Sequence, residues 1–137
     1  MSLTPLHALP TLESEPCCDW AVLTQQQAGQ HRVLLAYAAA RDFLSVPKTF
    51  IMVEFRADAP LEIHQMQRDD YLADIDQTDD APNNGLFQLA CDAPPQICVL
   101  LVGTTALEIT YETCIEHPHL YHCADAGHAL THFMTQH

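Results

Sequence analysis

Residues 31–45 read HRVLLAYAAARDFLS, and their conformation decides between two folds. Five apolar residues recur at helical spacing: Val33, Leu34, Tyr37, Ala40 and Leu44. The alanines favour helix, and Pro47 would end it. However, Val33, Leu35 and Tyr37 also alternate, as in a strand. We therefore expect an early helix here and keep a strand over 32–38 as the alternative.

Short segments that are typical of strands surround this stretch. They are residues 19–25, 49–55, 61–66, 86–91, 96–102 and 106–116, the last of which Pro118 should end. QICVLLV at 96–102 is apolar on both faces, so we expect it at the centre of the sheet. A helical apolar stripe follows near the C-terminus: Ala126, Ala129, Leu130, Phe133 and Met134.

Together these segments predict an α+β fold. It has a mostly antiparallel sheet of five to six strands, one early helix and one C-terminal amphipathic helix. If residues 32–38 form a strand instead, a β-sandwich with a C-terminal helix is favoured. Residues 1–16 contain three prolines and predict an extended N-terminal arm. Residues 17–137 show neither a repeat nor a linker, which predicts one domain.

The N-terminus and the cysteines indicate a cytoplasmic protein. The first residues lack a basic segment followed by an apolar one, so we see no secretory signal. The longest unbroken apolar run is Ile97 to Val102, too short to span a membrane. The six cysteines include no C-x-x-C motif, and we expect reduced thiols.

Charge is distributed unevenly along the chain, whose net charge is −13. All five basic residues lie between Arg32 and Arg68, whereas eleven carboxylates and no lysine or arginine follow. Such a field disfavours direct binding to nucleic acid or to an anionic membrane, which depends on basic side chains. We therefore expect a basic protein surface as the partner, and the sequence also permits a homodimer.

Two acidic groups are the predicted partner-binding residues. The first lies in RDDYLADIDQTDD, where aromatic and aliphatic side chains accompany the carboxylates: Asp69, Asp70, Tyr71, Asp74, Asp76, Asp79 and Asp80. The second is a row on one face of the 106–116 strand: Glu108, Glu112 and Glu116. Cys114 shares that solvent-facing side, and we expect residues 68–85 to form an acidic connection.

The last 24 residues hold six of the nine histidines and raise the question of a metal. Four side chains supply a zinc-like set: Cys114, His117, His128 and His132. The helical histidines should face away from the apolar stripe, and the spacing is shorter than in zinc fingers. We therefore expect no cofactor and keep zinc as the alternative.

Signs of catalysis are few. None of the four glycines cluster, which excludes a phosphate-binding glycine loop, and the serines lack a nucleophile motif. Glu54 and Glu62 could act as acid and base, but solvent-facing strand positions explain them better. The sequence favours an acidic protein-interaction module: an inhibitor, an immunity-type antagonist, a chaperone-like adaptor or a nucleic-acid mimic. The alternatives are a zinc-binding protein and a small hydrolase.

Overall fold

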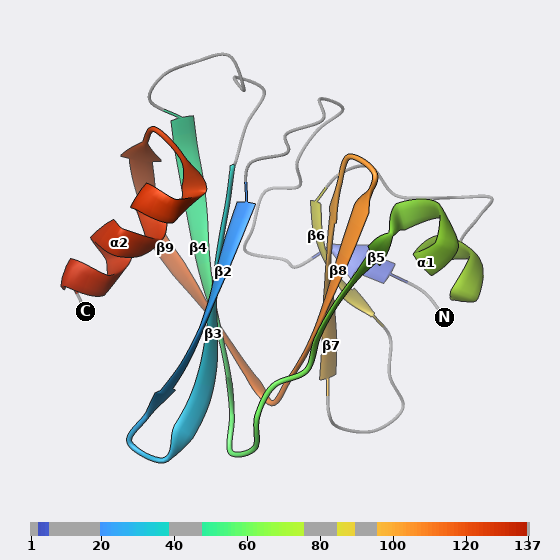
Figure 1. The fold of residues 1–137 in the computed structure, drawn as a ribbon, viewed down its shortest axis with the longest axis horizontal. Helices are drawn as coiled ribbons and strands as arrows, with labels where there is room; N and C mark the ends of the chain where they lie inside the picture. Colours follow the sequence, from blue (N-terminus) through green and yellow to red (C-terminus); the bar gives the residue numbers. More distant parts are fainter. Residues whose placement is uncertain (1–2, 6–19, 39–47, 76–84, 90–95, 137) are drawn as a thin grey trace.

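The computed structural model describes residues 3–5, 20–38, 48–75, 85–89 and 96–136. Within them the chain forms two antiparallel sheets and two helices (Figure 1). One sheet, here called sheet A, has the strand order β1-β6-β7-β8-β5. Its strands are β1 (Leu3–Pro5), β5 (Ile63–Gln67), β6 (Gly85–Leu89), β7 (Gln96–Val102) and β8 (Thr105–Tyr111).

The other sheet, sheet B, has the order β2-β3-β4-β9. Its strands are β2 (Trp20–Gln27), β3 (Gln30–Ala38), β4 (Lys48–Ala57) and β9 (Thr113–Cys123). Ala28 and Gly29, both with positive φ, connect β2 to β3 in the way that two-residue hairpin turns require. Helix α1 (Arg68–Asp74) follows β5, and helix α2 (Ala126–Gln136) ends the chain.

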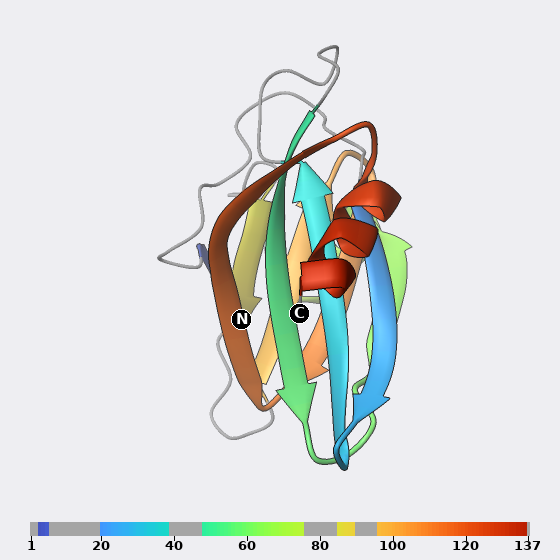
Figure 2. The ribbon, with the colours of Figure 1, turned by 90° about the vertical axis from the view of Figure 1, so that its left-hand side faces the viewer.

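The two sheets pack face to face around one apolar layer. Alternate residues of β3 and β4, such as Val33, Tyr37 and Phe55, meet Leu100 and Ile109 of sheet A there. The opposite face of sheet B packs on α2, and the opposite face of sheet A packs on α1 (Figures 1 and 2). The order of layers is therefore α1, sheet A, sheet B and α2.

The predicted α+β class is confirmed, including an early helix and a C-terminal amphipathic helix. The early helix is α1, however, while residues 32–38 belong to β3, as in the alternative interpretation. Val33 to Ala38 are all buried because β3 is covered by sheet A on one face and α2 on the other. When both faces of a strand are apolar, apolar and polar residues do not alternate along its sequence. The sequence of β3 therefore resembled that of a helix.

Several strand predictions are confirmed, among them β7 at the centre of sheet A. The predicted strand over 106–116 is wrong: β8 ends at Tyr111, and β9 begins at Thr113 in the other sheet. Strand β9 also continues past Pro118, which an edge strand tolerates. Of the predicted N-terminal arm, Leu3–Pro5 pair with β6, and residues 6–16 lie outside the described residues.

Candidate functional site

The predicted acidic residues occupy separate parts of the structure. Residues 68–74, expected as part of a connection, form α1, where Asp69, Asp70 and Asp74 are exposed. Tyr71, one of the predicted partner-binding residues, is buried against sheet A together with its neighbour Leu72. The reason is amphipathicity: one turn of helix places the apolar pair inward and the carboxylates outward. Asp76, Asp79 and Asp80 lie outside the described residues.

The row Glu108, Glu112 and Glu116 is not formed, because the chain changes sheets at Glu112. The carboxylate of Glu108 accepts a hydrogen bond of 2.8 Å from Tyr71 Oη on the α1 side of sheet A. Glu112 lies exposed at the bend, and Glu116 belongs to sheet B. Glu112 is therefore separated from both of the other glutamates.

Glu112 lines a cleft at the end of the molecule where the chain crosses twice between the sheets. One crossing connects β4 to β5, and the other connects β8 to β9, both at the lower end in Figure 1. The corner cleft encloses about 470 Å³. Its lining residues are Ala57, Ala59, Pro60, Leu61, Glu62, Thr110, Tyr111 and Glu112.

Hydrogen bonds between the two crossings fix the shape of the corner cleft. The Asp58 backbone N–H donates to Glu112 Oε1 at 2.7 Å, and the Thr110 N–H donates to the Glu62 carbonyl at 3.0 Å. The Glu112 N–H donates to the Arg56 carbonyl, also at 3.0 Å. The cleft therefore has a mostly apolar lining and two carboxylate residues, Glu62 and Glu112. Hydrogen bonds between the two crossings hold its backbone in place.

Tyr111 lines the cleft with little exposed surface, because its ring belongs to the layer between the sheets. Its ring packs against Phe55 with centroids 5.1 Å apart, and its hydroxyl donates to Gln88 Oε1 at 2.6 Å. A hydrogen-bonded, buried ring keeps one orientation at little entropic cost when a ligand arrives. An apolar wall beside carboxylates suits a ligand with an aliphatic stem and a cationic end.

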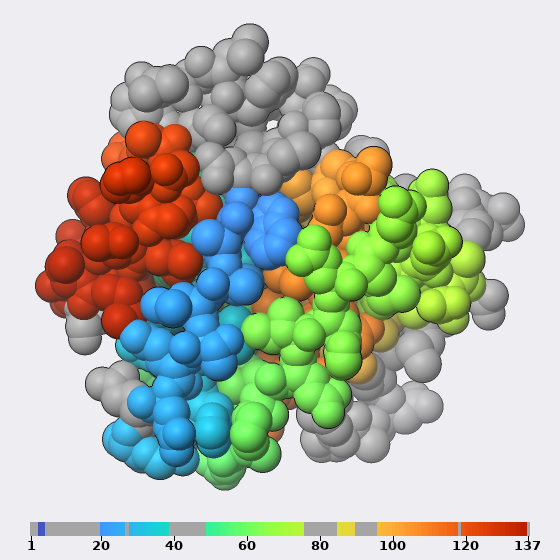
Figure 3. All heavy atoms as spheres, viewed as in Figure 1, coloured from blue at the N-terminus to red at the C-terminus, as the bar shows by residue number. Residues whose placement is uncertain are grey.

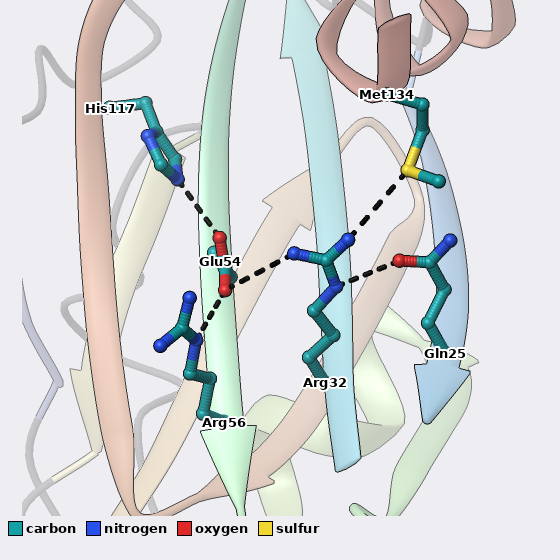
Figure 4. A network of polar contacts seen from close by, with 6 residues as sticks. All are labelled: Gln25, Arg32, Glu54, Arg56, His117 and Met134. Carbon is teal, nitrogen blue, oxygen red and sulfur yellow. Dashed lines mark hydrogen bonds and ion pairs between the residues drawn. The ribbon is translucent and has the colours of Figure 1, made fainter. Parts of the chain in front are cut away.

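A second polar cluster surrounds Glu54 on the α2 side of sheet B (Figure 4). The Glu54 side chain is 2% exposed. It accepts a hydrogen bond from Arg56 Nε, lies 3.6 Å from Arg32 Nη1 and lies 3.2 Å from His117 Nε2. Burial alone would raise the pKa of Glu54, but the hydrogen bonds from Arg56 and His117 and the two guanidinium charges hold it below its ordinary value.

The Glu54 cluster and its contacts connect all four strands of sheet B to α2. Arg32 also donates from Nε to Gln25 Oε1 at 2.7 Å, and its Nη2 lies 3.9 Å from Met134 Sδ on α2. His117 packs its ring against Phe133 of α2 at 4.7 Å. Two guanidinium groups and an imidazole around one carboxylate form a satisfied buried charge, which indicates a structural role.

Glu54 was predicted to face solvent, and this prediction is wrong. Phe50 and Met52, four and two residues before it, lie on the same face of β4 and are fully buried. The sequence did contain a signal of this burial: Glu54 occupies the same alternating positions as these two large apolar residues. Nothing in the sequence shows that Arg32 would lie beside it, because that pairing depends on the register of β3 and β4.

The structure does not bring the zinc-like set together. Cys114 packs toward the layer between the sheets, not toward solvent as predicted, whereas His117 faces α2. His128 lies 2.8 Å from Asp125, whose carboxylate also caps α2 by accepting the His128 backbone N–H. In the described part of the chain, no three metal-ligating side chains are grouped so that they could hold a metal ion.

The described thiols are poor nucleophiles and poor metal ligands. Burial, with Glu116 nearby, raises the pKa of Cys114 to about 12. Burial also raises the pKa of Cys98 and Cys123 above their ordinary values. Because the thiolate is the reactive and metal-binding form, these side chains remain neutral near pH 7.

Comparisons with protein-family models, curated proteins and solved structures gave no match. None of the helices in the described ranges is long and apolar enough to cross a membrane.

Proposed function

We propose that this protein is an acidic interaction module that docks on a basic surface of a partner protein. The corner cleft receives a lysine or arginine side chain of that partner. The observation that carries the proposal is the combination of an apolar lining with Glu62 and Glu112 in one braced cleft. The aliphatic stem packs along Pro60 and Leu61, and the cationic end reaches the carboxylates.

The charge of the whole chain supports such a partner. With a net charge of −13, the protein attracts basic surfaces over a longer distance than any single contact. The exposed carboxylates of α1, including Asp69, Asp70 and Asp74, contribute to this attraction without lying in the cleft. Long-range charge speeds association, whereas the cleft provides selectivity for the side chain. Inhibitors, immunity-type antagonists, chaperone-like adaptors and nucleic-acid mimics all use surfaces of this kind.

A labelled hexalysine peptide and its ε-acetylated counterpart test the cleft by fluorescence anisotropy. We expect the lysine peptide to bind and the acetylated peptide not to bind. The double variant Glu62→Gln/Glu112→Gln should weaken binding about tenfold, equivalent to about 1.4 kcal/mol. The control Asp69→Asn/Asp70→Asn removes the same charge from α1 and should weaken binding by less than about threefold.

Three results would contradict the proposal. They are equal binding of the acetylated peptide, equal effects of the two double variants, or no binding of the lysine peptide. Salt gives an additional criterion: raising it from low to high concentration should reduce the association rate more than it raises the dissociation rate.

A further inference from the structure

Strand β2 forms one edge of sheet B and is the feature that carries a further inference. It pairs with β3 along all eight residues, from Trp20 opposite Tyr37 to Gln27 opposite Gln30. Among the described residues, no strand pairs with its other side. Helix α2 lies over the face of the sheet, and β2 remains at the molecular surface beside β5 (Figures 2 and 3).

The other three sheet edges carry features that discourage strand pairing. Strand β1 has three residues and ends in Pro5, and β5 has five residues. Strand β9 contains Glu116 and Pro118, and its register with β4 shifts between Phe50 and Met52. Short length, proline, charge and bulges are the devices by which proteins protect edges.

Strand β2 has none of these features. Its sequence, WAVLTQQQ, contains no charged residue and no proline, and its register with β3 is continuous. It is also the longest edge without a charge, and the backbone groups on its outer side, which no described strand pairs, are a template for another strand. Such an edge is expected to be covered in the working form of the protein.

We propose that two copies of this chain associate through antiparallel pairing of β2 with β2 of the second copy. The result is a continuous eight-stranded sheet with two-fold symmetry. Two copies of the same strand can pair antiparallel about a two-fold axis. One such edge on each copy is therefore enough to form a closed dimer.

Charge favours a second copy as the occupant. Two molecules with a net charge of −13 repel each other at most surfaces, but β2 carries no charge. Its neighbour β3 contributes Arg32 directly opposite Gln25, while Asp69, Asp70 and Asp74 lie on α1 and Glu108 lies in sheet A. The pairing strand therefore adds no acidic group of its own to the interface.

Sedimentation equilibrium of the full chain tests the dimer over about a hundredfold range of concentration. The double variant Thr24→Lys/Gln26→Lys places like charges on both sides of the seam and should lower the association constant at least about tenfold. Both positions are exposed on the monomer, so the fold should tolerate them. The matched control is Gln65→Lys/Gln67→Lys, at exposed positions of the edge strand β5, which should leave the dimer intact.

Both variants make the net charge less negative by the same amount, so weaker long-range repulsion cannot explain a difference between them. A monomeric wild-type protein, a dimeric β2 variant or a monomeric β5 variant would each overturn the proposal. Hydrogen exchange of the wild-type protein gives a readout that needs no variant. The amides of residues 20–27 should gain protection as concentration rises, and those of β5 should not. Equal changes in both strands would also count against β2 pairing.

Discussion

At the scale of single residues, Glu54 should contribute to stability through its ion pairs. It is the charged residue that is buried within the described part of the chain, and its partners are Arg32, Arg56 and His117. Losing the carboxylate leaves two guanidinium groups without a counter-charge on a partly covered surface. We expect Glu54→Gln to lower the free energy of unfolding by about 2 kcal/mol near pH 7.

The effect of Glu54→Gln should depend on pH in a defined direction. The pKa of Glu54 in the folded protein is below the ordinary value of 4.5. A lowered folded pKa stabilises the protein above the ordinary value, and this stabilisation disappears as pH falls through the folded pKa. Urea unfolding of both proteins should therefore show a constant gap above about pH 5 that closes in acid.

Glu62→Gln is the control for this comparison, because the Glu62 side chain is 72% exposed. It should leave the free energy of unfolding nearly unchanged at every pH. If the gap between wild type and Glu54→Gln widens in acid, the charge of Glu54 is not what stabilises the cluster.

Tyr37 presents the opposite situation, a buried polar group with no partner among the described residues. Its ring lies between the sheets, and no hydrogen bond joins its hydroxyl to another described residue. Burial raises its pKa above the ordinary value, which keeps the hydroxyl neutral. An unsatisfied hydroxyl costs free energy, so Tyr37→Phe should be neutral or stabilise the protein by up to about 1 kcal/mol. Chemical unfolding gives the measurement, and a loss of stability would reveal a missing partner.

At the scale of elements, α2 should stabilise the fold through its buried face. Phe133 is 1% exposed and contacts both His117 and Tyr121. Phe133→Ala should lower the free energy of unfolding by about 3 kcal/mol, because it opens a cavity above the Glu54 cluster. His132→Ala, one residue earlier on the exposed side, should change it by less than about 0.5 kcal/mol. Similar losses in urea unfolding would mean that α2 does not dock through Phe133.

The alternation of β9 leads to a prediction about metal. Because Cys114 and His117 project to opposite faces, one ion cannot reach both. We expect a chelator to leave the melting temperature unchanged, since structural zinc would contribute to folding directly. Thermal melts with and without chelator give the comparison. Stoichiometric zinc in purified protein that is lost on His128→Ala would contradict this prediction.

At the scale of the whole molecule, the net charge of −13 should oppose folding through self-repulsion. Sodium chloride screens this repulsion, so raising it to about 0.5 M should increase the melting temperature by about 3 °C. The Glu54 carboxylate is buried, so its ion pairs should weaken less than pairs between two exposed side chains. A melting temperature that falls with salt would mean that attractive pairs outweigh the repulsion.

The sequence by itself determined one helix and one central strand. The stripe from Ala126 to Phe133 predicted α2, and the doubly apolar run at 96–102 predicted the central strand β7. It also determined the charge distribution and hence the basic partner that we propose. These features follow from composition and local periodicity, which need no knowledge of neighbouring strands.

Only the tertiary structure decided whether 32–38 would be helix or strand, because a segment buried on both faces has no distinctive period. It also decided that Tyr71 is buried and that Glu54 meets Arg32, which is 22 residues away in sequence. The corner cleft depends on two chain crossings that lie side by side, and Glu62 and Glu112 are 50 residues apart. Such contacts arise from strand register and sheet packing, which are properties of the whole chain.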